Sequence, residues 1–415
     1  MNRSYSLWVS SSIGSDESGV GTEENPFRTI GRALKYNYNA TQLLVINLMD
    51  ANNNVIGNWE LEYVGSLVIQ KSETASFNWR ANIWGNLTGV DGPSYFLHGE
   101  GAQGDTASCL HLKDLSISFY RKTAVTALNY MNVEIDHCEF LSSGYQHAPD
   151  DMGGALLAKS SLPTSRIGLS YVECSGNGAG SGGCLAVVYP PGGGFLTDNC
   201  VMESNNAAQD GGAIYSNVSG RITQSNFTNN VAGIGSGGAY YYSGSPATPV
   251  DGFETTVISM SIFYENQASS NGGAVAAEYV FLKSASSAYQ ANHASYGGAI
   301  YVKGDLVALA GLNEVSNNVA QISGGGIYLE TMRFTSLSDY FFKYNECKSS
   351  SICGAEVYLQ GGDVTIPNTS GFFYNRTLNT TAICLAGEVS VEFVAQDQFP
   401  GIAIGSGSKM AAQSD

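Results

Sequence analysis

The side chains best suited to acid–base chemistry lie in one short run, residues 133–140, which reads Val-Glu-Ile-Asp-His-Cys-Glu-Phe. The run places Asp136 directly before His137. A carboxylate beside an imidazole can hold or release a proton near neutral pH, which is what general acid–base catalysis requires. The same two residues have a second interpretation, as a polar pair at the end of a strand.

Three further acids are candidates for the same chemistry. Asp150 and Asp151 follow the run closely, and Asp210 precedes the diglycine of a later repeat. Glycan hydrolysis uses two carboxylates at a fixed separation. These acids could supply such a pair from equivalent corners of a repeating fold, or they could be solvated turn residues.

Tyrosines recur at one position of the repeat, and they form a candidate binding surface. If the aliphatic residue before each one points inward, strand alternation makes the tyrosine point outward. A line of outward rings suits stacking on glycans or packing against a protein partner, and the alternative is ordinary aromatic stacking on a sheet. The residues are Tyr215, Tyr241, Tyr301 and Tyr328.

Asparagines recur at a second position, three residues after an aromatic in most copies. Asparagine side chains commonly bond to backbone groups at turns, so we expect a structural ladder of stacked amides here, with no ligand. The series is Asn230, Asn266, Asn292, Asn318, Asn345 and Asn375.

The eight cysteines do not have the spacing of a zinc site, and no metal or cofactor is expected. Cys138, Cys174 and Cys200 are 36 and 26 residues apart. Because these gaps are close to the repeat length, the three could share a column within disulfide range. A stack of buried thiols is the alternative.

These side chains are positioned by a sequence repeat, and a pair of glycines marks each copy of it. Its consensus is aromatic-x-x-Asn-x-Ala, a short gap, then Gly-Gly-Ala-aliphatic-Tyr. Successive copies are 25 to 35 residues apart. The second glycines are taken as Gly154, Gly183, Gly212, Gly238, Gly273, Gly298, Gly325 and Gly354.

Each copy consists of short apolar runs interrupted by Gly, Asn and Ser, which is typical of strands and turns. One copy cannot bury its apolar face, whereas stacked copies can, with equivalent positions about 4.8 Å apart. A propeller blade would need some 40 residues in four strands. The pattern therefore predicts an all-β fold, a parallel β-helix.

The two motifs together resemble the repeat of the chlamydial polymorphic outer-membrane proteins, over roughly residues 138–385. The resemblance implies a right-handed parallel β-helix of the pectin-lyase-like type, used mainly in surface adhesins. Full matches to the glycine motif are Gly153–Leu156, Gly211–Ile214, Gly272–Val275 and Gly297–Ile300, and full matches to the second motif begin at Phe227, Phe263, Phe342 and Phe372.

A short helix is expected before the repeats, with Asn25 as its N-cap and Pro26 in its first turn. It would close the open end of the solenoid, and this segment resembles the N-terminal cap of pectin-lyase-like β-helices. The predicted organisation is residues 1–40 for the first strand and helix, 41–150 for irregular early coils, 151–400 for the diglycine repeats, and 401–415 for a flexible tail.

Composition narrows the function classes. The 415-residue chain carries a net charge of −17, with 19 basic and 36 acidic residues, which argues against a nucleic-acid surface. It has no run of 18 apolar residues, so no membrane insertion is expected. No signal peptide is visible at the start, while eight Asn-x-Ser/Thr sequons are a weak indication of secretion. An extracellular or particle-surface location fits these features.

Three functions remain open. A non-enzymatic structural or adhesive module, contacting proteins or glycans within a larger assembly, is the preferred interpretation. A polysaccharide lyase or hydrolase is the second, since Ile135-Asp136-His137 resembles a pectate lyase motif. However, none of the nine arginines stands in the Arg-x-Pro-x-x-Arg setting of those enzymes. A subunit of a viral or flagellar fibre is the third.

Overall fold

A computed structural model describes the fold of most of the chain. The described residues are 4–36, 42–53, 60–75, 77, 80–85, 93–102, 108–144, 148, 150–245, 254–309, 311–331, 334–349, 354–366, 370–373, 383–394, 402–404 and 409–413. They fall into two compact units, Met1–Val201 and Met202–Asp415, which are described separately.

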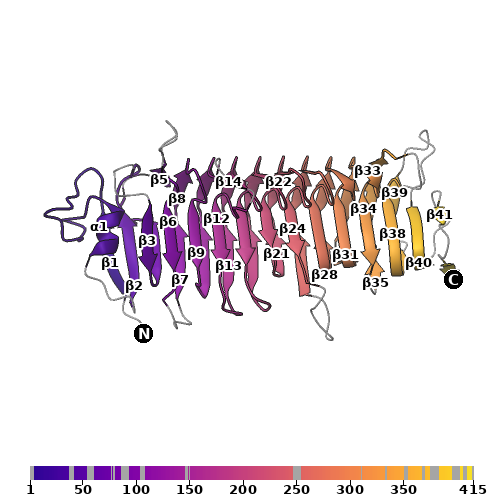
Figure 1. The fold of residues 1–415 in the computed structure, drawn as a ribbon, viewed down its shortest axis with the longest axis horizontal. Coiled ribbons are helices and arrows are strands. Elements are labelled where there is room, and N and C mark those ends of the chain that lie inside the picture. The colour runs from indigo at the N-terminus through magenta and orange to yellow at the C-terminus, as the bar shows by residue number, and fades with distance from the viewer. Residues whose placement is uncertain are drawn as a thin grey trace. The chain divides into compact units, whose positions relative to one another are not determined.

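The first unit is built from parallel strands that follow one another coil by coil (Figure 1). One ladder contains, in hydrogen-bonded order, β1 (Ser4–Val9), β2 (Leu43–Leu48), β4 (Leu67–Lys71), β7 (Cys109–Lys113), β10 (Asn132–Asp136), β13 (Arg166–Ser170) and β17 (Gly194–Asp198). A second contains β3 (Leu61–Val64), β6 (Leu97–Glu100), β9 (Val125–Leu128), β12 (Leu156–Lys159) and β16 (Leu185–Val188). A separate sheet contains β5 (Ala81–Trp84), β8 (Leu115–Ser118), β11 (Glu139–Leu141) and β14 (Glu173–Ser175), and β15 (Gly178–Ala179) follows.

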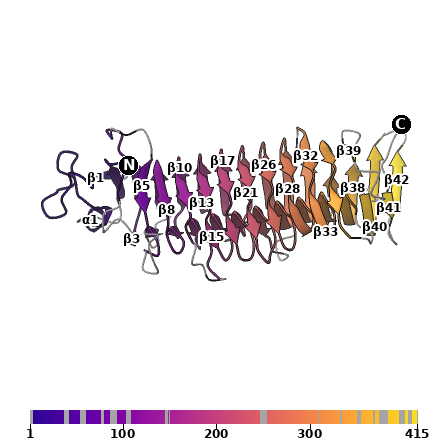
Figure 2. The same ribbon diagram turned by 90° about the horizontal axis from the view of Figure 1, so that it is seen from above.

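The second unit repeats this arrangement with more regular coils (Figure 2). Its first ladder contains β20 (Ile214–Ser216), β24 (Tyr240–Ser243), β28 (Val275–Ala285), β31 (Ile300–Ala308), β34 (Ile327–Thr331), β38 (Val357–Ile366), β40 (Ile383–Val394) and β41 (Ile402–Ile404). The long strands of this ladder also pair with β25 (Glu254–Ser259), β35 (Phe334–Ser336) and β42 (Lys409–Gln413), and β21 (Gly220–Thr223) pairs with β25.

Two more sheets complete each coil of the second unit. The first contains β22 (Asn226–Thr228), β26 (Ile262–Tyr264), β29 (Ala288–Gln290), β32 (Asn313–Ser316), β36 (Tyr340–Lys343) and β39 (Gly371–Phe373). The second contains β19 (Asn206–Ala207), β23 (Val231–Ala232), β27 (Gln267–Ala268), β30 (His293–Tyr296), β33 (Val319–Ser323) and β37 (Glu346–Cys347). β18 (Val201–Glu203) lies where the two units meet in the sequence.

Strand alternation separates the interior from the surface. Ile214, Val275 and Ile300 lie in register and are fully buried, and the residue after Ile214 or Ile300 is a half-buried tyrosine. Inside another sheet, Phe227, Phe263 and Tyr289 stack at centroid distances of 4.8 and 5.0 Å. Each coil therefore buries its apolar side chains against the equivalent ones of the next coil, as expected for a parallel β-helix.

The paired glycines line up at one corner, which confirms the predicted fold class. The amide of Gly238 donates to the carbonyl of Gly272 at 3.1 Å, and the amide of Gly273 donates to that of Gly297 at 3.2 Å. A Cβ on Gly273 would lie 2.1 Å from the carbonyl oxygen of Gly298. Only glycine permits this approach of one coil to the next.

The last repeat is shifted by one residue from the sequence alignment. Ile327 pairs with Val357, and Tyr328 pairs with Tyr358. Gly354, with φ of 54°, therefore takes the place of the first glycine, where Gly324 has φ of 68°. The shift places a glutamate, Glu356, at a buried position that is small in the other copies.

The N-terminal helix begins later than predicted. α1 spans Ile30–Lys35, and its N-cap is Thr29, whose side chain accepts a hydrogen bond from the amide of Arg32. Thr29 is in turn held by Asp16, which accepts from its amide and hydroxyl at 2.9 and 2.7 Å. A better-held capping residue thus replaces Asn25, and Pro26 precedes the helix.

Two short segments of the predicted tail are among the described residues. Ile402–Ile404 and Lys409–Gln413 both pair in parallel with β40. No helix among the described residues has the length and hydropathy needed to cross a membrane.

Candidate functional site

A groove of about 490 Å³ in the first unit is lined mainly by charged and polar side chains. It follows the outer face of the sheet formed by β5, β8, β11 and β14. Its lining residues are Lys71, Arg80, Asn82, Asp114, Ser116, His137, Glu139 and Glu173. The volume is within the range of sites that hold small ligands.

Strand register explains how residues far apart in sequence meet in this groove. Asn82 pairs with Ser116, Ser116 with Glu139, and Glu139 with Glu173, so the four form one outward column. The neighbouring strand residues Phe140 and Ile117 are fully buried and fix this orientation.

A second column lies at the turn two residues earlier. Asp114, His137 and Tyr171 each have φ between 50° and 55°, a left-handed conformation that turns the chain sharply into the next strand. His137 and Tyr171 stack with ring centroids 4.7 Å apart. Asp114 and His137 line the groove, and Tyr171 lies beside it, stacked on His137.

Arg80 connects the carboxylates of this groove. Its Nε donates to the carbonyl oxygen of His137 at 2.7 Å, which anchors the guanidinium. Its Nη1 stands 4.0 Å from one oxygen of Glu139 and 4.0 Å from one oxygen of Glu173. Ser116 Oγ donates to the other oxygen of Glu139 at 2.6 Å. The two acids lie on adjacent coils, with one cation between them.

The predicted pair of Asp136 and His137 lies at this site. His137 Nδ1 is 2.8 Å from Asp136 Oδ1, and both side chains are accessible. Asp136 is the last residue of β10, so both interpretations of the pair apply: it lies at a strand end, and its carboxylate contacts the imidazole.

The other predicted acids are not brought to the groove. Asp151 accepts from the amide of Ala148 at 2.7 Å and stabilises a turn, and Asp150 is exposed next to it. Asp210, in the second unit, accepts from the amide of Ser236 at 2.8 Å. Burial raises the pKa of Asp210, and this hydrogen bond opposes the change.

Sequence reasoning missed Arg80, Glu139 and Glu173 as site residues. A signal was present, because His137-Cys138-Glu139 and Tyr171-Val172-Glu173 both read aromatic-x-Glu. Among the described residues, no group of three or more His, Cys, Asp or Glu side chains is placed to hold a metal ion.

The tyrosine series forms a column on the second unit. Tyr215 pairs with Tyr241, Ala276 interrupts the column, and Tyr301 pairs with Tyr328. The shifted last repeat adds Tyr358, which the sequence alignment missed. Ring centroids are 5.3 Å apart from Tyr301 to Tyr328 and 4.7 Å apart from Tyr328 to Tyr358. These rings are half-buried, so their outer edges remain accessible.

A polar column lies beside the tyrosines, two residues further along each strand. Glu278, Lys303 and Glu330 are in register, and Lys303 Nζ is 3.2 Å from Glu330. Tyr328 donates its hydroxyl to Gln360 at 2.7 Å. Burial raises the pKa of Tyr328, and it also raises that of Glu278, where Lys303 opposes the change. The result is a fixed aromatic surface bordered by charges.

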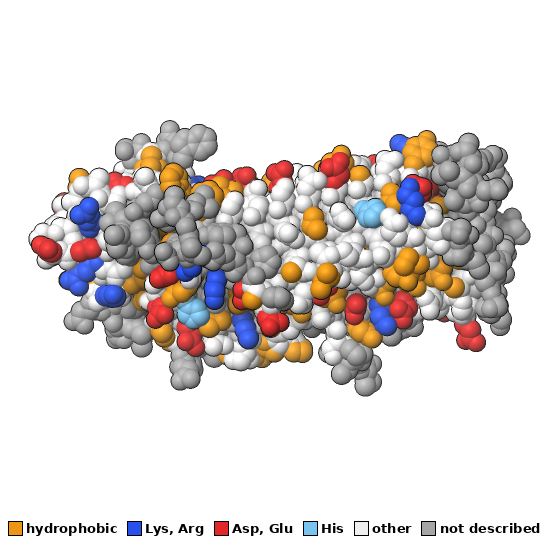
Figure 3. Space-filling model, turned by 45° about the horizontal axis from the view of Figure 1, so that its top comes forward, with side chains coloured by type: hydrophobic (Ala, Val, Ile, Leu, Met, Phe, Trp, Pro, Cys, Tyr) orange, Lys and Arg blue, Asp and Glu red, His pale blue; other side chains and the backbone are white. Residues whose placement is uncertain are grey.

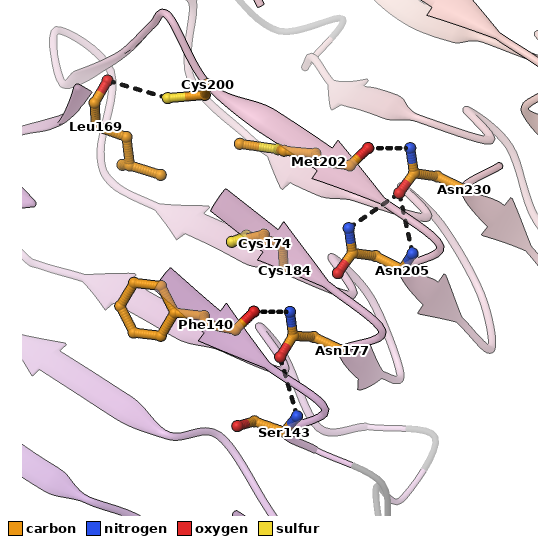
Figure 4. Close-up of a disulfide and its surroundings, with 10 residues drawn as sticks. All are labelled: Phe140, Ser143, Leu169, Cys174, Asn177, Cys184, Cys200, Met202, Asn205 and Asn230. Atoms are coloured by element: carbon orange, nitrogen blue, oxygen red, sulfur yellow. Dashed lines mark hydrogen bonds between the residues drawn. A yellow bond between two sulfur atoms is a disulfide. The ribbon is translucent and has the colours of Figure 1, made fainter. Parts of the chain in front are cut away.

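The asparagines form a buried ladder, shown in part in Figure 4. Asn230 Nδ2 donates to Asn266 Oδ1 at 2.9 Å, and Asn266 Nδ2 donates to Asn292 Oδ1 at 3.0 Å. The pattern continues through Asn318 to Asn345, while Asn375 lies outside the described residues. Each amide also donates to a backbone carbonyl, so these side chains hold the turn.

The predicted cysteine column is wrong. Cys174 forms a disulfide with Cys184, ten positions later in the same coil (Figure 4). Cys174 is in register with Phe140, so it stands two residues away from the position of Cys138. Cys138 and Cys200 are buried, and burial raises the pKa of the Cys138 thiol to about 12. The disulfide crosses the interior of one coil, whereas the sequence argument compared equivalent positions of adjacent coils.

On the face drawn in Figure 3, white surface (backbone and uncharged polar side chains) predominates, and acidic and basic side chains occur in small mixed groups. This agrees with a charged-residue content of only 13%. The groove is one place where charged side chains lie together.

Comparison with known proteins bears on the repeat. Residues 261–278 match the model of the Chlamydia polymorphic membrane protein repeat. No curated protein matches the chain. Among solved structures, tailspike protein 3 of bacteriophage CBA120 is similar, with 12% identity over 88% of this chain and a TM-score of 0.35. The chain spans 56% of that tailspike's length.

The GH136 lacto-N-biosidase from Eubacterium ramulus is also similar, with 10% identity, 99% of this chain and 68% of the enzyme covered, and a TM-score of 0.33. Neither structural likeness carries an inference about activity. The matched segment 261–278 contains both sequence motifs, from Phe263 to Val275. The chain is therefore a parallel β-helix that carries a repeat of the Chlamydia polymorphic membrane protein type.

Proposed function

We propose that the chain is a non-enzymatic structural or adhesive module, exposed on a cell or particle surface, that contacts glycans or partner proteins. The supporting observation is the tyrosine column, in which Tyr301, Tyr328 and Tyr358 stack within one sheet face. Tyrosine contributes a large contact area and a hydroxyl at low entropic cost, which suits recognition surfaces.

The contacts would be individually weak and additive. Equivalent side chains recur about every 4.8 Å along the ladder, so a repetitive ligand can engage several of them together. The adjacent charged column, with Lys303 and Glu330 paired at 3.2 Å, would favour ligands with polar groups at the same spacing. A fibre subunit, with a further protein as partner, would use the same surface.

The test is binding of the purified chain to a glycan array, together with its self-association by sedimentation. Tyr328→Ser removes the central ring and is expected to reduce binding, whereas Tyr328→Phe keeps the ring and most of the affinity. Tyr264→Ser, on the exposed face of β26, is the matched control. Absence of both glycan binding and self-association in the unmodified chain would contradict the proposal.

A second function, glycan hydrolysis, is favoured by one observation. Glu139 and Glu173 lie on adjacent coils in the groove, beside the Asp136–His137 pair. Two neighbouring carboxylates are the minimum for that chemistry. Turnover of an oligosaccharide panel that is lost in Glu173→Gln would replace the adhesive proposal with an enzymatic one.

A further inference from the structure

The groove of the first unit has the features of a carbohydrate-binding site. Four successive coils contribute to it through Arg80/Asn82, Asp114/Ser116, His137/Glu139 and Glu173, and Tyr171 lies at its edge, stacked on His137. Four coils extend over about 14 Å at the usual strand spacing. With a volume of about 490 Å³, the groove can hold a ligand of two or three hexose units.

The spacing around Arg80 favours hydroxyl groups. Nη1 is 4.0 Å from a carboxylate oxygen of Glu139 and 4.0 Å from one of Glu173, which exceeds the length of a direct hydrogen bond. One oxygen atom can lie within hydrogen-bond distance of both ends of such a gap. A hydroxyl accepts from the guanidinium and donates to the carboxylate, and few other groups do both.

Two such gaps share one nitrogen atom. One gap lies between Nη1 of Arg80 and Glu139, and the other lies between Nη1 and Glu173 on the adjacent coil. Two neighbouring hydroxyls of one sugar ring can therefore fill both gaps together. Both sides of the first gap are held in place by hydrogen bonds. Arg80 Nε donates to the carbonyl oxygen of His137 at 2.7 Å, and Ser116 Oγ donates to Glu139 at 2.6 Å. A site held in place before binding loses less entropy when the ligand arrives.

The aromatic pair supplies the apolar part of the site. His137 and Tyr171 stack with an interplanar angle of 18°, and Tyr171 is 50% exposed. An exposed ring can pack against the C–H face of a sugar. Because Tyr171 is two residues before Glu173 and His137 is two residues before Glu139, each aromatic lies beside the carboxylate of its own coil.

The charges of the groove select against ionic sugars. Asp114, Glu139 and Glu173 outnumber the two cations, Lys71 and Arg80, which disfavours a uronic acid. The same excess of carboxylates attracts an amino sugar, but its ammonium group would have to displace the guanidinium that Glu139 and Glu173 already face. A neutral polyhydroxylated ligand meets neither obstacle.

We propose that this groove binds a neutral oligosaccharide, with two adjacent sugar hydroxyls bridging Arg80 to Glu139 and Glu173 and a sugar face packed on Tyr171. The inference rests on the proposed function only for the class of ligand, because the tyrosine column belongs to the other compact unit.

The test is calorimetric titration of the full chain with neutral tri- and tetrasaccharides, and with uronic-acid and amino-sugar oligosaccharides of the same length. Neutral sugars are expected to bind best. Arg80→Met and Glu173→Gln are each expected to weaken binding by about tenfold or more, since each removes hydrogen bonds to a charged group. Tyr171→Ala is expected to weaken it as well.

Two controls keep the result interpretable. Arg166→Met removes an arginine of the same unit that is not part of the groove, and it should bind as the unmodified chain does. Arg80→Lys keeps the positive charge but lacks the planar guanidinium. Partial binding by a folded Arg80→Lys chain would therefore exclude a folding defect as the cause of the loss in Arg80→Met.

The inference would be overturned if no neutral oligosaccharide binds, if uronic-acid or amino-sugar oligosaccharides bind best, or if folded Arg80→Met and Glu173→Gln chains bind normally. Tyr328→Ser is expected to leave groove binding intact. Failure of the tyrosine-column proposal and failure of the groove proposal are therefore distinguishable.

Discussion

Glu356 occupies the position of a small residue in the diglycine repeat and is fully buried. Asn345 Nδ2 donates to its Oε2 at 2.5 Å, while its Oε1 has no hydrogen-bond partner among the described residues. Burial raises the pKa of Glu356 from 4.5 to about 8, against the opposing effect of Asn345. The carboxyl is therefore protonated in the native state at neutral pH.

Stability should consequently fall as pH rises from about 4.5 to 8. In that window the native state retains a proton that the unfolded state has released, so unfolding is favoured by rising pH. Glu356→Gln should remove this part of the pH dependence and stabilise the protein at pH 8 by an amount on the order of a few kcal/mol. Urea unfolding of both proteins at pH 5 and pH 8.5 measures the difference, and parallel pH profiles would show that Glu356 ionises freely.

Asn292 shows what one member of the amide ladder contributes. Its Nδ2 donates to the carbonyl of Phe263 and to Asn318, and its Oδ1 accepts from the amide and side chain of Asn266. Asn292→Ala would leave these buried partners unsatisfied, so we expect a loss of about 2–4 kcal/mol of unfolding free energy. Asn226→Ala, at an exposed position of β22, should change stability little in the same urea titration.

At the scale of the strands and corners, the diglycine turn sets the distance between coils. In six copies the second glycine lies against the backbone of the next copy, so its missing side chain is a steric requirement there (Gly154, Gly212, Gly238, Gly273, Gly298 and Gly325). The early coils lack this signature and are less regular in length, so the sequence predicted irregular coils there without showing which strands are neighbours. In one of these early coils, the turn between β7 and β8 consists of a single residue, Asp114.

Gly273→Ala tests this requirement directly. The added methyl group would lie 2.1 Å from the carbonyl oxygen of Gly298 and 2.4 Å from the amide nitrogen of His293. We expect a loss of about 3 kcal/mol or more, or failure to fold. Gly168→Ala is the matched control, because nothing lies within 4 Å of its Cβ position. Equal melting temperatures for the two variants would refute the steric argument.

At the scale of the whole molecule, solubility rests on uncharged polar groups and an excess of negative charge. The chain carries 36 acidic and 19 basic residues, and its isoelectric point is about 4.6. Solubility should pass through a minimum near that pH, because the net repulsion between molecules vanishes there. Light scattering between pH 4 and 8 measures this, and a flat profile would contradict the expectation.

The sequence alone determined the periodic part of this protein. The repeated diglycine, asparagine and tyrosine show which residues of successive coils are equivalent. Stacking of the coils places equivalent residues in columns. Strand alternation then decides whether the side chains of a column point inward or outward. That reasoning was sufficient for Asn230, Asn266 and Asn292 in the interior and for Tyr301 and Tyr328 on the surface.

Only the tertiary structure decided the contacts that do not follow the period. Arg80 lies near Glu139 and Glu173 through the register of the early coils, and sequence spacing does not reveal that register because these coils differ in length. The disulfide of Cys174 crosses the interior of one coil, where repeat equivalence gives no information. The repeat determines which residues are neighbours along a column. Contacts across one coil, or between coils of different length, depend on the three-dimensional path of the chain.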